Sequence, residues 1–200
     1  MQQDENEETT TTADFAGSDR EEIAALAAIL PRALIAEEIA EPIAGQWIGS
    51  RNKAVVDGHP AFARHEMNAG LAVGLFHARR ARHLVRGLEG AAAALEAEQA
   101  GLNAQLEARG CAETRRISRL LILSQDGAPR FFRQVEKLEE RFARRLAVLI
   151  LECDEESLGE AAFGPGKKAR ALLINHKQAV IRLLLLLDWS ESGLVGDVSD

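Results

Sequence analysis

Three short and fully apolar runs in the C-terminal half constrain the fold more than any other feature. They are 120–123 (Leu-Leu-Ile-Leu), 146–151 (Leu-Ala-Val-Leu-Ile-Leu) and 171–174 (Ala-Leu-Leu-Ile), and they start 26 and 25 residues apart. That spacing is about the length of one strand–helix unit with its loops. Each run is too short for a buried helix and is apolar throughout, as is typical of a strand covered on both faces by helices. The runs predict a parallel sheet of at least three strands within residues 112–190.

The segments that follow the runs have helical patterns. After the first run, Asp126 is expected to cap a helix and Pro129 to lie in its first turn. Its buried face is predicted to hold Phe131, Val135, Leu138 and Phe142. A short helix and a Gly-Pro-Gly turn at 164–166 precede the third run, and a last helix is expected from about His176 to Trp189. We therefore expect a three-layer α/β domain at 111–190.

An all-α helical bundle is the alternative fold. The apolar positions of the helix at 129–142 keep helical spacing into the second run, through Leu146 and Leu149. The β-branched residues of that run, and the Gly-Pro-Gly before the third run, favour strands instead.

Residues 20–110 are predicted to form a helical region. Pro31 should divide its first helix, and Asp57-Gly58 marks a turn. From Pro60 to about Arg109 no strong breaker interrupts the helical pattern. Within it, Leu88, Leu95 and Leu102 lie seven apart in a heptad pattern that begins at Leu84, which is typical of a coiled coil. We expect residues 84–106 to mediate homo-oligomerisation or to pack in a hairpin within the chain.

The net charge of −7 is concentrated at the two ends of the chain. Residues 1–19 carry six acids and no base, and residues 191–200 carry three acids and no base. Their low apolar content predicts an acidic disordered tail at 1–19 and a second acidic tail at 191–200. The part between them is close to neutral, so the acidic total does not exclude an anionic partner.

Two groups of arginines are candidate nucleic-acid contacts. Arg79, Arg82 and Arg86 have the spacing of one helix face, together with His83, which is typical of a stripe that follows phosphates. Arg115, Arg116 and Arg119 come directly before the first apolar run. A solvated helix face with no ligand is the alternative interpretation of the stripe.

The sequence contains no motif for a metal, a cofactor or a catalytic site. No two of the five histidines have the i, i+4 spacing of helical metal ligands, and Cys111 and Cys153 form no paired motif. An enzyme would have to use acids that follow the apolar runs or His176, but acids at helix starts are usually caps. The N-terminal segment lacks the basic and apolar residues of a secretory signal, and residues 169–189 are interrupted by polar side chains. We therefore expect a cytoplasmic protein with no membrane span.

The order of elements after residue 115 resembles a known superfamily. Asp126 after a strand, Ser157-Leu158-Gly159 in a short helix, and the glycine turn at 164–166 are similar to motifs of the kink-turn-binding ribosomal proteins. The same superfamily supplies a C-terminal domain to eukaryotic-type release factors. The resemblance covers residues 115–189 and implies an α/β/α sandwich. It also implies a role in translation or in a ribonucleoprotein.

This chain lacks one feature of that superfamily. The Gly-x-Asn-Glu segment that grips kink-turn RNA is absent from the residues before Arg115, so no RNA contact is carried over by position. The functional expectation is a non-enzymatic binding protein associated with RNA, a ribonucleoprotein or the ribosome. The alternative is an assembly or adaptor protein that acts through its long helix without nucleic acid.

Overall fold

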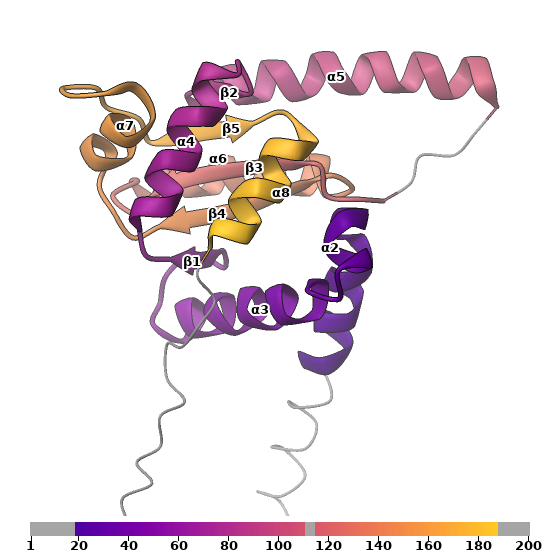
Figure 1. Cartoon of the computed structure of the whole chain (residues 1–200), viewed down its shortest axis with the longest axis horizontal. Helices are drawn as coiled ribbons and strands as arrows, with labels where there is room; N and C mark the ends of the chain where they lie inside the picture. The colour runs from indigo at the N-terminus through magenta and orange to yellow at the C-terminus, as the bar shows by residue number, and fades with distance from the viewer. Residues whose placement is uncertain (1–18, 111–114, 188–200) are drawn as a thin grey trace, which may run out of the picture.

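The computed structural model describes residues 19–110 and 115–187 (Figure 1). The acidic tails predicted at 1–19 and 191–200 lie outside these ranges, apart from Asp19, which is helical. The described residues form a mixed α/β fold with a five-stranded sheet, so the all-α alternative is wrong. After a helical stretch at 19–29, the elements are α2 (Arg32–Ala36), α3 (Ala40–Val56), β1 (Ala63–His65), α4 (Ala69–Arg80), β2 (Leu84–Arg86), α5 (Leu88–Arg109), β3 (Arg119–Ser124), α6 (Pro129–Phe142), β4 (Leu146–Leu151), α7 (Glu155–Phe163), β5 (Ala171–Ile174) and α8 (Lys177–Leu186).

The three apolar runs are strands of one sheet, with the order β1-β4-β3-β5-β2. Strands β1, β4 and β3 are parallel, whereas β5 is antiparallel to both β3 and β2. The prediction that all three runs are parallel is therefore wrong for β5. The two edge strands, β1 and β2, come from residues before 110, so the sheet joins both sides of the domain boundary predicted there.

The direction of β5 follows from the short path between β4 and β5. The nine-residue helix α7 begins near the end of β4 where the chain leaves the sheet. The loop after α7 then folds back onto this helix. The approach is so close that a Cβ added at Gly159 would lie 2.2 Å from the carbonyl oxygen of Lys167. Ser124 at the end of β3 donates its backbone N–H to Arg170, just before β5. The chain therefore enters β5 at the end of the sheet where β3 and β4 finish. Strand β5 must then run antiparallel to β3.

The expected long helix at 60–109 is replaced by strand β1 and two helices, α4 and α5, with strand β2 between them. Asn68 caps α4 by accepting the N–H of Leu71 at 2.8 Å, and α4 ends at Arg80. Residues 84–86 then pair with β5 as strand β2. Gly87, with φ of 84°, turns the chain into α5. The basic stripe predicted on one helix face is therefore wrong, because Arg79 lies in a helix and Arg86 in a strand.

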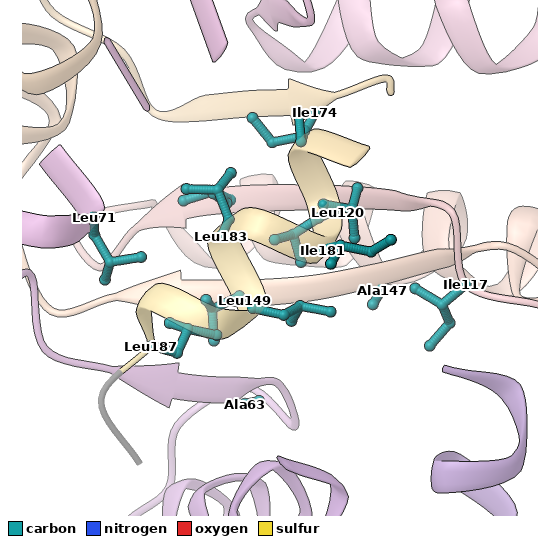
Figure 2. Packing of buried hydrophobic residues seen from close by; sticks show 14 of the residues in the cluster. Ala63, Leu71, Ile117, Leu120, Ala147, Leu149, Ile174, Ile181, Leu183 and Leu187 are labelled. Atoms are coloured by element: carbon teal, nitrogen blue, oxygen red, sulfur yellow. The ribbon is translucent and has the colours of Figure 1, made fainter. Parts of the chain in front are cut away.

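Helices cover both faces of the sheet. On one face, α4, α7 and α8 and the helices of residues 19–56 pack against one set of strand side chains. Figure 2 shows Ile181 and Leu183 of α8, and Leu187 directly after it, over the strands that carry Leu120 and Leu149. On the other face, α5 and α6 pack against the alternate strand residues. All six residues of β4 are buried, as predicted for a strand covered on both sides.

The heptad pattern is only partly a helix seam. Leu84 belongs to β2 rather than to α5. Ala91 and Leu95 are fully buried against the sheet within the same chain, and Leu88 is half-buried there. The C-terminal half of α5 projects beyond the sheet (Figure 1), where Leu102 and Leu106 are partly exposed.

Candidate functional site

The structure brings Arg79 and Arg86 together on one aromatic ring. The Arg79 guanidinium carbon lies 5.7 Å, and that of Arg86 5.3 Å, from the centroid of the Phe163 ring. These side chains come from α4, β2 and α7, so residues 77 positions apart in sequence meet here. Arg86 also donates to the backbone carbonyl of Lys168. We call Arg79 and Arg86 over Phe163, together with the exposed Arg82 in the turn between α4 and β2, the arginine cluster.

Arg82 lies between the other two arginines in sequence, in an unusual turn at the end of α4. Its N–H donates to Arg79 at 2.9 Å, and the N–H of His83 donates to Ala78 at 2.8 Å. These two bonds define a Schellman motif at the end of α4. Arg82 holds the left-handed position of that motif with φ of 58°. Glycine is the usual residue at such a position, because a side chain there is strained.

The charges around the cluster are unequally paired. Lys168 and Arg170 form ion pairs with Glu155, and Lys168 also approaches Glu156. Within the described part of the chain, no ion pair is found for Arg79, Arg82 or Arg86, and all three are exposed. The cluster therefore presents exposed cationic groups without a carboxylate partner among the described residues, and one nitrogen of Arg86 is engaged by the Lys168 carbonyl.

The second predicted arginine group lies elsewhere and is engaged within the fold. Arg116 donates to the carbonyl of Leu30 at 2.6 Å. Arg119 pairs with Glu98 of α5 at 2.8 Å, and only Arg115 is exposed. Arg115 and Arg116 precede β3 and Arg119 is its first residue, whereas Arg86 lies two strands away in β2. The structure thus separates the two arginine groups that the sequence combined.

The acids that follow the strands accept hydrogen bonds from backbone N–H groups. Asp126 does not cap α6, whose preceding residue is Ala128. It accepts the Ser124 hydroxyl and, at 3.1 Å, the N–H of Glu155. Asp154 caps α7 by accepting the N–H of Ser157 at 2.7 Å, and this hydrogen bonding lowers the pKa of Asp154. Burial raises the pKa of the neighbouring Cys153 thiol to about 11, so the thiol is protonated and weakly nucleophilic at neutral pH.

A groove of about 770 Å³ runs between α4 and α8, on the side of α4 away from α7. Its walls are mainly small and apolar, with basic side chains at one end; the lining residues are Ala69, Gly70, Val73, Gly74, His77, Ala78, Ala81, His83, Gln178, Ala179, Arg182, Leu185 and Leu186. His83 stacks on His176, with ring centroids 3.9 Å apart and planes at 8°. Partial burial, and then the nearby His176, lower the pKa of His83.

Sequence reasoning selected Arg79, Arg82 and Arg86 but missed Phe163 and the groove. Phe163 has no local signal, because its role depends on residues from two other elements. The groove did have a signal, since neither 69–80 nor 177–186 contains an acid. Among the described residues, no group of three or more His, Cys, Asp or Glu side chains is placed to hold a metal ion. No helix within 19–110 or 115–187 is both long enough and apolar enough to cross a membrane.

Comparisons with known proteins give little further information. No family model matches the sequence, and no curated protein matches it either. A solved structure of a protein with unknown function from Bacillus halodurans C is similar over 60% of this chain and 99% of that chain. Its identity is 22% and its TM-score is 0.41, which is too low to support an argument about fold or function.

Proposed function

We propose that the protein is a non-enzymatic RNA-binding protein that contacts phosphates through the arginine cluster. The observation that carries the proposal is the convergence of Arg79 and Arg86 on Phe163, with Arg82 between them in sequence. Guanidinium groups suit phosphate because they present planar, paired donors. Stacking on Phe163 restricts both groups, so less side-chain entropy is lost when a phosphate binds.

The same geometry indicates the mode of binding. Tyrosine is absent from the chain, and the exposed edge of the cluster is made of cations rather than aromatic faces. Base stacking and base-edge readout therefore have few groups to use. Binding should depend weakly on RNA sequence and steeply on salt concentration.

A salt titration of a labelled structured RNA tests the proposal. Each lost phosphate contact should lower the log–log salt slope by about 0.7 to 0.9, so Arg79→Gln with Arg86→Gln should lower it by roughly 1.5. The matched control is Arg130→Gln with Arg133→Gln, which removes two exposed arginines from α6 on the opposite face of the sheet. Equal slopes for the two double variants would contradict the proposal. Absence of binding by the parent chain at low salt would also reject it.

The layer arrangement belongs to the same proposal. We assign the sheet and its covering helices to a three-layer α/β/α sandwich, supported by separate apolar clusters on the two sheet faces. That architecture is the one implied by the resemblance to kink-turn-binding ribosomal proteins. The antiparallel β5, and the edge strands β1 and β2 from residues before 110, are features of this chain that an atomic comparison with that superfamily must explain.

Assembly through α5 is the second candidate function. It is favoured by the projection of α5 beyond the sheet, which leaves Leu102 and Leu106 on one face with partial exposure. Two such leucines provide a short apolar seam for a second helix. Sedimentation of the full chain at tens of micromolar tests this candidate, and a monomer at that concentration would reject it.

A further inference from the structure

The groove between α4 and α8 is an apolar surface that the arginine cluster does not use. Val73 is 55% exposed, Leu185 49% and Leu186 37%. The close approach of the two helices depends on Gly74, because a Cβ there would lie 2.8 Å from Cδ1 of Leu186 and 2.9 Å from Cδ2 of Leu183. A glycine on one helix and leucines on the other thus form a floor with exposed apolar sides.

The residues that line the groove include one permanent cation, Arg182, and no acid. Neither α4 nor α8 contains an acidic residue. His77, His83 and Arg182 line the groove, and no ion pair to Arg182 is found within the described residues. The lining from Ala69, the first residue of α4, to its C-cap Ala81 extends about 18 Å at the rise of an α-helix, which corresponds to about three turns.

We propose that this groove binds an amphipathic helix of a partner protein whose apolar stripe is bordered by acidic residues. The apolar walls fit a stripe with anchors at i, i+3, i+4 and i+7, as in other helix-in-groove complexes. The Arg182 guanidinium in the lining selects acids by charge complementarity. A second copy of this surface would place like charges against each other, which disfavours a symmetric pair of the same grooves.

Synthetic labelled peptides of about 16 residues, long enough to fill the groove, provide the test by fluorescence anisotropy with the full chain. The first peptide is a helix with leucine at the four anchor positions and glutamate on its polar face. The second is identical except that lysine replaces glutamate. The proposal predicts at least about tenfold tighter binding of the glutamate helix at low salt. Equal affinity for the two helices would overturn it.

Two variants locate the binding and test its charge preference. Val73→Ser with Leu185→Ser should weaken binding of the glutamate helix about tenfold or more, because it removes exposed apolar contact area without opening the core. The matched control is Val55→Ser with Val56→Ser, which alters two exposed valines at the end of α3. Arg182→Glu should weaken the glutamate helix and strengthen the lysine helix. Loss of binding in the α3 control to the same extent, or no change with Arg182→Glu, would contradict the assignment.

The chain itself supplies one competing occupant. Residues 188–200 contain four acids, no base, and Trp189, Leu194 and Val195. If the full chain fails to bind the glutamate helix and a chain ending at Leu187 binds it, the occupant is this segment, and the partner-helix proposal is overturned. Equal binding by both chains supports the partner helix. The arginine-cluster variants should not alter peptide binding, so this proposal and RNA binding fail independently.

Discussion

Arg82 occupies a backbone position at which an arginine is energetically unfavourable. A non-glycine residue in the left-handed region costs about 1 kcal/mol relative to glycine. Strained residues of this kind concentrate at functional sites, where the side chain is needed. Arg82 is exposed, and no partner of its guanidinium group is found within the described residues, so a phosphate contact is the reason that we propose for an arginine at this position.

We predict that Arg82→Gly stabilises the fold and weakens RNA binding. The free energy of unfolding should rise by about 0.5 to 1 kcal/mol in urea denaturation, because the strain at φ of 58° is relieved. Glu38→Gly is the matched control, since Glu38 has φ of 61° at the end of α2 and is also exposed. It should stabilise by a similar amount and leave RNA affinity unchanged. If both variants lose the same affinity, Arg82 is not a contact.

Glu139 gives the fold a dependence on pH. Burial on α6 raises the pKa of Glu139 to about 7, Arg51 of α3 lowers it in part, and Glu136 and Glu140 raise it further. Because the folded pKa exceeds the unfolded value, the carboxyl favours folding fully below about pH 4.5. That contribution is lost as the pH rises through about 7.

Glu139→Gln should therefore stabilise the protein only at high pH. At about pH 4 the variant and the parent should have nearly equal free energies of unfolding, since both side chains are neutral. At about pH 9 the variant should be more stable by about 1 to 3 kcal/mol, because it lacks the free-energy cost of burying the Glu139 carboxylate. Glu136→Gln, at an exposed position of the same helix, is the control. A pH-independent difference for Glu139→Gln would show that charge is not the cause.

At the scale of elements, the sequence predicted the strands well and their directions only partly. The runs at 120, 146 and 171 are strands because each is apolar at every position and flanked by turn residues. Equal spacing along the chain, however, does not specify its path in space. The backbone of Lys167 packs closely on Gly159, and this return of the loop goes with the antiparallel direction of β5. Such a contact leaves no periodic pattern of apolar residues in the sequence.

The division of residues 60–109 was missed for a different reason. His77, Arg79 and Arg80 in the last turn of α4 are a recognised helix-end signal. The usual glycine after them is replaced by Arg82, so the strongest mark of the end is lacking. The three-residue strand β2 is then too short to show an alternating pattern, and it forms because β5 offers an edge with which to pair.

Helix α5 should respond differently to substitutions in its two halves. Leu95→Glu should destabilise the whole fold by about 3 kcal/mol or more, because an acid would be buried among apolar side chains. Leu102→Glu with Leu106→Glu should leave the unfolding free energy within about 1 kcal/mol of the parent, since both positions are partly exposed. Urea unfolding measures both effects. A monomeric mass for the second variant, with a larger mass for the parent, would support assembly through α5. Strong destabilisation by Leu102→Glu with Leu106→Glu would show instead that this half packs within the chain.

At the scale of the whole molecule, the sheet joins segments that the sequence suggested were separate. Strands β1 and β2 from the first half form the two edges of a sheet whose centre comes from the second half. The same assembly places Phe163 beneath Arg79 and Arg86, and it moves Arg116 and Arg119 into contacts with Leu30 and Glu98. Which residues meet in the candidate site therefore depends on how distant segments are arranged in space. The periodicity of apolar residues in one sequence does not specify that arrangement.

Amide hydrogen exchange of the full chain, with and without a structured RNA at low salt, tests the location of binding most directly. If the arginine cluster binds phosphates, RNA should slow exchange in peptides that cover 79–87 and 163–170. Exchange in peptides that cover 115–119 and α6 should not change, and Arg79→Gln with Arg86→Gln should abolish the protection. Protection at 115–119 or on α6, with none at 79–87, would contradict the proposed RNA-binding surface.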